Sequence, residues 1–324
     1  MVNHTAMKEF LLLGFSEVRE LQLVQAALFL LVYLVALMGN LLIVVVTDLD
    51  QRLHTPMYFF LRNLSVFDLC YISVTVLKSI HNSLTDRRSI SFLGCAAQVF
   101  SVVLFETSEV FLLTAMSYDR YAAICFPLRY EVIMGRGGCG KMTAASWLSG
   151  GLERRYPHCV TFSLLFCDTN ATRQFFCDIP SLIRLSCSRS YIDEIAVLGL
   201  SVFLCLGCFV CIVVSYACIF RAVLRMPAAE GRAKAFSTCL PHLVVVILFL
   251  STSFSAHLKP PSDTPSTLNL LLSVFYTVVP PPPNPLIYSL RNRDMKAVLG
   301  RVLRWKFFTY NGIPLVCSKL EHQH

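Results

Sequence analysis

Seven long apolar segments dominate this chain of 324 residues. A helix needs about 20 apolar residues to cross the roughly 30 Å hydrocarbon core of a bilayer. Continuous apolar runs favour helices over a β-barrel, whose strands alternate. We therefore expect an all-α integral membrane protein with seven transmembrane helices in one bundle. The expected spans are about 24–47, 57–80, 96–121, 141–164, 194–220, 236–257 and 267–290.

The composition supports this class and argues against others. Only 15% of the residues are charged, whereas soluble domains carry about 25%. No nucleophile–base pair and no phosphate-binding glycine loop is evident, so we expect neither an enzyme nor a cofactor. Cys205, Cys208 and Cys211 have helical spacing without an accompanying His or carboxylate, which favours small buried apolar residues over metal ligands. No basic run with interleaved aromatic residues suggests nucleic-acid binding.

Basic residues predict the orientation of the bundle. Seven spans place the two ends of the chain on opposite sides, and Lys and Arg are more numerous on the side of the C-terminal segment. That side should be cytoplasmic, with residues 1–23 outside, 24–290 forming the helices and 291–324 inside. Apolar residues at helical spacing between basic ones in 292–308 predict an amphipathic helix lying on anionic lipid.

Sequons and cysteines fall on the predicted outer side. Asn3 and Asn170 open N-glycosylation sequons there, whereas Asn63 lies within a span. Disulfides persist outside the cell, where we place four cysteines. Four cysteines allow three pairings, and spacing alone does not choose among them. The four are Cys95, Cys167, Cys177 and Cys187.

Polar residues at membrane depth are rare and usually face the interior of a bundle. Asp68 and Glu109 are two such interior carboxylates, and two carboxylates in a dry interior would not both ionise without a cation. Pro285 removes a backbone hydrogen bond and would permit bending. These residues are Asn40, Asp68, Glu109, Asn284, Pro285 and Tyr288, together with the triplet Asp119–Arg120–Tyr121 at the end of the third span.

Five strings resemble the olfactory receptors, a family of rhodopsin-like (class A) G-protein-coupled receptors, and cover the chain from about 10 to 300. They begin at Leu12, Pro56, Met116, Lys234 and Pro285 and read LLGFS, PMYFFL, MSYDRY, KAFSTCLPHL and PLIYSLRN. The resemblance implies a plasma-membrane receptor for small volatile odorants that activates a stimulatory olfactory G protein and raises cAMP. It also implies the disulfides Cys95–Cys177 and Cys167–Cys187.

The resemblance also assigns roles to residues. Asn40, Asp68 and Glu109 would form a central polar or cation site. Coupling and activation would use Asp119, Arg120, Tyr121, Lys234, His242, Asn284, Pro285 and Tyr288. An odorant pocket would be walled by Val102, Val103, Glu106, Thr107, Leu200, Leu204, Ser253, Phe254 and His257. Glu106 could bind an amine, hold a proton, or pair with His257.

Two segments depart from the family pattern. Glu153–Arg154–Arg155 and Pro157 fall inside the fourth span, where each charge costs roughly 2.5–3.5 kcal/mol on an insertion scale. Four consecutive prolines, Pro280 to Pro283, cannot form regular α-helix. The alternatives are therefore a poorly folding or non-signalling receptor, or a transporter or channel, although the inverted repeats typical of transporters are not evident.

Overall fold

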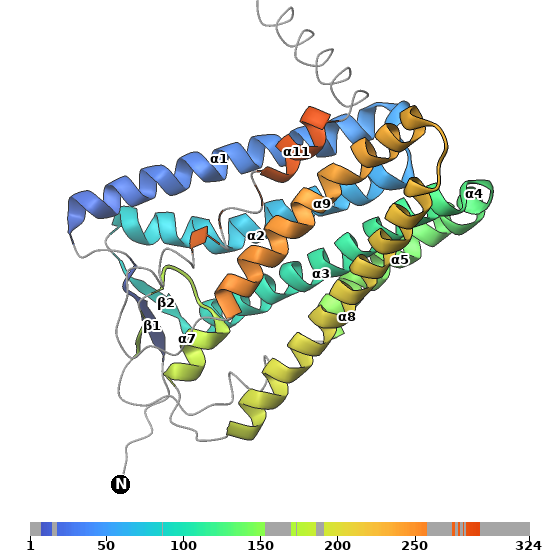
Figure 1. Ribbon diagram of the computed structural model, residues 1–324. Coiled ribbons are helices and arrows are strands. Elements are labelled where there is room, and N and C mark those ends of the chain that lie inside the picture. Colours follow the sequence, from blue (N-terminus) through green and yellow to red (C-terminus); the bar gives the residue numbers. More distant parts are fainter. Residues whose placement is uncertain are drawn as a thin grey trace, which may run out of the picture.

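A computed structural model gives the fold (Figure 1). It describes residues 8–14, 18–85, 87–152, 170–172, 174–185, 191–257, 274–275, 278, 281 and 283–291. The main helices are α1 (Arg19–Leu49), α2 (Pro56–Thr85), α3 (Phe92–Cys125), α5 (Arg136–Leu152), α8 (Tyr191–Leu224), α9 (Ala229–His257) and α11 (Pro283–Arg291). The shorter ones are η1 (Gln51–Leu53), η2 (Pro127–Arg129), α4 (Tyr130–Ile133) and α7 (Ile179–Arg184).

Within the described residues, five helices are long and apolar enough to cross a membrane. They lie in α1, α2, α3, α8 and α9, where we expected the first, second, third, fifth and sixth spans. Each helix continues past its apolar core; α1, for example, begins at Arg19 rather than near residue 24. α5 and α11 coincide with parts of the expected fourth and seventh spans.

Several predicted features lie outside the described residues. The charged segment 153–158, most of the stretch preceding α11, and the predicted amphipathic helix at 292–308 are among them. Asn3, Cys167 and Cys187 are also outside.

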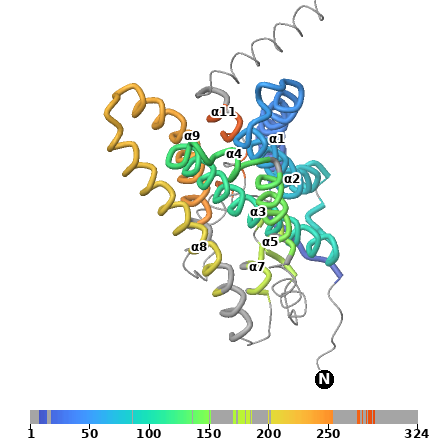
Figure 2. The backbone as a smooth tube through the Cα atoms, turned by 90° about the vertical axis from the view of Figure 1, so that its right-hand side faces the viewer, coloured from blue at the N-terminus to red at the C-terminus, as the bar shows by residue number. Residues whose placement is uncertain are grey.

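α3 lies at the centre of the bundle. It packs against α2, α5, α8 and α9, with α1 and α2 on one flank and α8 and α9 on the other (Figures 1 and 2). Leu112 and Met116 of α3 are buried in the largest apolar cluster, with Phe67 of α2 and Val245 of α9. Many large apolar residues of α1 and α8 are instead exposed, as expected where a helix faces lipid.

A small sheet caps one end of the bundle, a feature absent from the all-α prediction. β1 (Glu9–Leu12) lies between β2 (Ser89–Ser91) and β3 (Ala171–Thr172). It pairs antiparallel with β2 and parallel with β3. The expected N-terminal tail, 1–23, therefore contains a strand and the start of α1. Such short strands have little periodicity, and their pairing depends on contacts distant in sequence.

Arg19 links the start of α1 to the end of α2 through hydrogen bonds. Its guanidinium donates hydrogen bonds to the backbone oxygens of Ser83 at 2.6 Å and Leu84 at 2.7 Å. The last carbonyls of a helix have no intrahelical partner, and a basic side chain can satisfy them. The end of the bundle that carries this contact and the sheet is called the sheet end.

The proline run ends where α11 begins. Pro283 is the first residue of α11, a position that tolerates proline because its missing N–H would have no partner there. Pro285 has no N–H to offer the carbonyl of Pro281. Asn40 supplies a replacement, because its Nδ2 donates to that oxygen at 3.1 Å. The described prolines thus fit a helix that starts at the last proline of the run.

Candidate functional site

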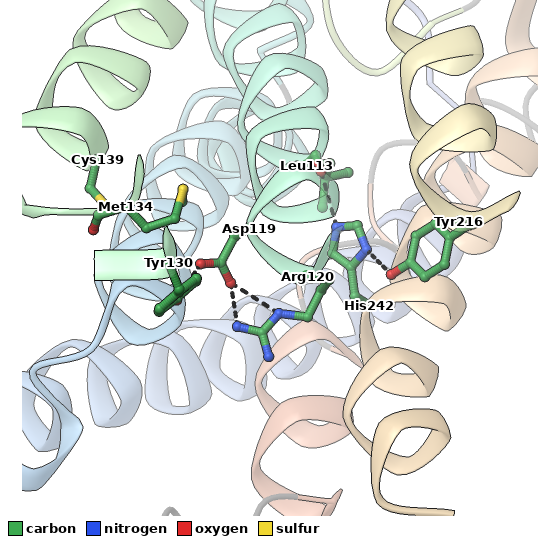
Figure 3. Close-up of polar contacts among 8 residues, drawn as sticks. All are labelled: Leu113, Asp119, Arg120, Tyr130, Met134, Cys139, Tyr216 and His242. Carbon is green, nitrogen blue, oxygen red and sulfur yellow. Dashed lines mark hydrogen bonds and ion pairs between the residues drawn. The ribbon is translucent and has the colours of Figure 1, made fainter. Parts of the chain in front are cut away.

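A polar cluster lies at the end of the bundle opposite the sheet. This end is called the Arg120 end, and Figure 3 shows the side chains of the cluster. Asp119 is 1% exposed. Its Oδ2 atom accepts hydrogen bonds from the Arg120 guanidinium, including one from Nε at 3.0 Å. Asp119 is buried and only 12% of the Arg120 side chain is exposed, which makes such a charge pair costly to break on one side only.

Tyr130 of α4 completes the partners of Asp119. The Tyr130 hydroxyl donates to Asp119 Oδ1 at 2.6 Å. Burial, and secondarily the neighbouring carboxylate, raises the pKa of this hydroxyl above its ordinary value. The hydroxyl therefore stays protonated and remains a donor across the physiological pH range. Pro127 begins η2, the turn that leads from α3 to α4.

His242 joins three helices beside this cluster. It is 2% exposed, and its Nε2 lies 3.1 Å from the carbonyl oxygen of Leu113 in α3. Its Nδ1 lies 2.7 Å from the hydroxyl of Tyr216 in α8. A carbonyl oxygen can only accept, so Nε2 carries the proton, and a neutral ring then accepts from Tyr216 through Nδ1. This arrangement ties α3, α8 and α9 together.

A cavity of about 810 Å³ opens beside these groups. Its apolar part comes from Met57 of α2, Met116 of α3, and Ala233 and Pro241 of α9. The charged and polar part of the lining comprises Asp119, Arg120, Glu230, Lys234, Ser237, Thr238, His242 and Tyr288. Arg120, Lys234 and His242, three of the residues to which the family resemblance gave a role in coupling and activation, line this same cavity. Tyr121 is turned toward Phe126 instead, with ring centroids 5.4 Å apart.

A second polar cluster lies in the middle of the bundle. Asp68 is fully buried, and its Oδ2 accepts from Asn284 Nδ2 at 2.9 Å. Glu109 is 4% exposed. Asp68 Oδ1 and Glu109 Oε1 have no hydrogen-bond partner within the described part of the chain. No group of three His, Cys, Asp or Glu residues suited to a metal ion occurs among the residues described.

Asn40 and Pro285 belong to the same region but make different contacts. Asn40 bonds to backbone oxygens, those of Ala36 at 3.0 Å and Pro281 at 3.1 Å. Gly39 lies against Pro285, so that a Cβ atom at Gly39 would meet the proline ring at 3.1 Å. Tyr288 is 5% exposed and contributes to the cavity at the Arg120 end.

The candidate pocket residues of α3 form an interior stripe. Val102 is buried with Phe175 and Phe176, which follow β3, and Val103 packs near the Cys95–Cys177 pair. Glu106 and Thr107 are half-buried. Leu204 of α8 and Ser253 of α9 are also half-buried. The side chains of Leu200, Phe254 and His257 lie outside the described residues.

One of the two predicted disulfides is confirmed. Cys95 of α3 and Cys177 are bonded, with Cα atoms 5.6 Å apart. Both are buried beside Phe10 of β1, so the bridge, the sheet and the segment after β3 form one cap.

Tyr130 and Tyr216 belong to the polar cluster at the Arg120 end but were not predicted from the sequence. Tyr216 lies in the predicted fifth span, which was interpreted from its apolar character, and Tyr130 lies outside every predicted span and family string. A lone tyrosine in the long apolar run of α8 was the available signal, because a buried Tyr hydroxyl needs a partner.

These long apolar helices, with buried carboxylates and an Asp–Arg pair at one end, define a multi-pass membrane protein with a polar interior. A sequence profile of the family described as "Olfactory receptor" matches residues 29–306. The chain belongs to the olfactory receptor family, whose members are class A G-protein-coupled receptors.

Individual relatives are similar in sequence to this protein along nearly its whole length. Human olfactory receptor 14A16 is 52% identical over 306 residues, which are 94% of this chain and 99% of that protein. Human olfactory receptor 14L1 is 55% identical over 299 residues, 92% of each chain. Gorilla olfactory receptor 1G1 is 44% identical over 301 residues, 93% of this chain and 96% of that one.

Proposed function

We propose that this chain is an odorant receptor that binds small volatile ligands inside its bundle and activates a stimulatory G protein, raising cAMP. Family membership gives the receptor class. The observation that carries the coupling step is the cavity at the Arg120 end, which gathers Arg120, Lys234 and His242 around one opening. The basic side chains that follow the helices at this end favour a cytoplasmic location.

The same charge distribution supports the complete topology. α5 and α11 would belong to the fourth and seventh membrane spans, and residues 292–308 would lie on the inner leaflet. The N-terminus would be extracellular, as the sequons at Asn3 and Asn170 also suggest.

Activation would release contacts that hold the Arg120 end together. Arg120 is engaged by Asp119, and His242 ties α9 to α3 and α8. A ligand that favours a more open arrangement of α9 would shift the population toward the state that admits the G protein. Arg120 would then exchange Asp119 for the C-terminal helix of the G protein.

Glu106 provides a specific expectation about the ligand. It lies four residues after Val102 and three before Glu109, so all three share one helix face. Both neighbours are buried, whereas Glu106 is half-buried. A carboxylate on a mostly apolar wall favours a ligand with a protonated amine, and the apolar part of the wall suits a small hydrocarbon body.

Odorant-evoked cAMP in cells selected for an N-terminal surface tag tests the coupling. Arg120→Ala should abolish the response at unchanged surface density. Arg62→Ala is the matched control, because Arg62 lies outside the cavity and forms an exposed ion pair with Asp48 at 2.7 Å and a contact over the Phe59 ring at 5.9 Å. Exposed ion pairs contribute about 0–1 kcal/mol. A full response in Arg120→Ala cells, or a ligand-evoked current without cAMP, would contradict the proposal and favour a channel.

Pairs of odorants that differ only in an amine or a hydroxyl test the role of Glu106. Glu106→Gln should lose potency by about tenfold or more for amines, since a charge-assisted hydrogen bond to the ligand is lost, with little change for alcohols. Glu20→Gln, the same change at an exposed position in the first turn of α1, is the control. Equal loss for both odorants would mean that Glu106 serves the fold rather than amine recognition.

A further inference from the structure

The sequon at Asn170 is part of the extracellular sheet rather than a free loop. Leu11 N–H donates to the Asn170 backbone oxygen at 2.7 Å. The Asn170 side-chain Nδ2 donates to the backbone oxygen of Glu9 at 3.2 Å. The atom that would carry a glycan is therefore already bonded to β1.

The third residue of the sequon is covered as well. Thr172 is 9% exposed and pairs with Leu12 of β1. Its backbone oxygen accepts from Leu13 N–H at 2.9 Å. Glycan transfer forms a bond between Asn Nδ2 and the first carbon of a pyrophosphate-linked lipid oligosaccharide; Nδ2 loses a proton and the lipid pyrophosphate leaves. The transferring enzyme must hold the Asn amide and the Thr hydroxyl together, so acceptor sequons normally lie in accessible loops.

Apolar packing keeps β1 in this position. Phe10 is fully buried, and its ring stacks on Phe92 with centroids 6.0 Å apart. Leu12 is 4% exposed in the same cluster, which also contains the bonded pair Cys95 and Cys177. β1 precedes the sequon in the chain, so it is already synthesised when Asn170 emerges.

We propose that Asn170 is a conditional glycosylation site, which docked β1 protects and undocked β1 exposes. The inference rests on the proposed orientation, which places the sheet end outside the cell. Folded chains then carry a glycan at Asn3 and not at Asn170, and a glycan at Asn170 marks chains whose cap did not assemble.

Glycan counting on the full-length chain tests this proposal. Mammalian cells express Asn3→Gln, which leaves Asn170 as the one sequon remaining on the proposed outer side, and the mobility shift caused by peptide N-glycosidase is measured. Asn3→Gln should show little or no shift. Adding Phe10→Asp, which removes the buried anchor of β1, should raise the shifted fraction at least fivefold. A further Asn170→Gln should abolish that shift.

Glu9→Ala is the matched control, because the Glu9 side chain lies in β1 but is exposed. In the Asn3→Gln background it should leave the shifted fraction unchanged. A complete shift in Asn3→Gln alone, or no gain with Phe10→Asp, would overturn the proposal. A chain with native Asn3 and no shift at all would instead contradict the proposed orientation, and this inference with it. Asn-to-Asp conversion at Asn170 after enzymatic release, read by mass spectrometry, identifies the site independently of folding.

Discussion

The side chain of Asn40 satisfies a backbone group that a proline leaves without a partner. Asn40 donates to the Pro281 oxygen because Pro285, four residues later, has no N–H. The polar character of Asn40 was visible in the sequence, but its partner was not. Leaving a buried carbonyl without its donor costs about 1–3 kcal/mol of stability, so the contribution of this contact can be measured.

Asn40→Leu should lower the free energy of unfolding by about 1–3 kcal/mol, because it leaves the Pro281 oxygen buried without a donor. Thermal unfolding of the detergent-solubilised protein measures the change. Asn63→Leu is the control, since Asn63 Nδ2 bonds to Phe59 four residues earlier in its own helix at 2.9 Å. Equal stability of the Asn40 variant and the native chain would show that the proline run needs no side-chain donor.

Tyr216→Phe should raise basal cAMP by about three- to tenfold, because it leaves His242 Nδ1 buried without its donor in the closed arrangement. The closed state loses stability and the population shifts toward the open one. The measurement is basal cAMP at matched surface density. Tyr118→Phe, at an exposed position on α3, should have no effect. Basal signalling that stays at the native value in Tyr216→Phe would contradict a restraining role for this contact.

At the scale of elements, the close approach of α1 to α11 depends on a glycine. A Cβ atom at Gly39 would lie 3.1 Å from Pro285 Cβ and 3.2 Å from its Cγ. The glycine therefore lets Asn40, the next residue, reach the proline segment. Sequence showed the pair Gly39–Asn40, but only the packing of the two helices explains why the first is so small.

Gly39→Ala should destabilise the protein by about 1–3 kcal/mol through overpacking against α11. Gly207→Ala in α8 should instead be neutral or stabilising by up to about 1 kcal/mol, because no atom lies within 4 Å of its Cβ position and alanine favours helix. Thermal unfolding of the two variants beside the native chain distinguishes them. An unchanged melting temperature for Gly39→Ala would mean that α1 and α11 can separate at little cost.

At the scale of the whole molecule, delivery to the membrane depends on the fourth expected span. Glu153, Arg154 and Arg155 each carry a cost of roughly 2.5–3.5 kcal/mol if they lie at membrane depth. Replacing all three by Ala should therefore increase surface labelling severalfold at equal total expression. Replacement of the exposed Arg129 and Glu131 by Ala is the control. Unchanged labelling of the triple variant would show that these charges do not enter the bilayer.

Sequence by itself determined the membrane class, most of the helical segments and the Arg120 triplet, because these depend on local hydrophobicity and on motifs of neighbouring residues. It also predicted the pair Cys95–Cys177 through family resemblance. The charge distribution and the sequons suggested the orientation, which remains a prediction.

Tertiary structure alone decided which distant groups meet. Asn284 bonds to Asp68, His242 joins Leu113 to Tyr216, and β1 pairs with the two short strands β2 and β3 farther along the chain. Each contact joins residues whose separation in sequence carries no periodic pattern, so only the packing of helices around α3 brings them together. The same packing places Arg120, Lys234 and His242 around one cavity, which their positions in the sequence do not reveal.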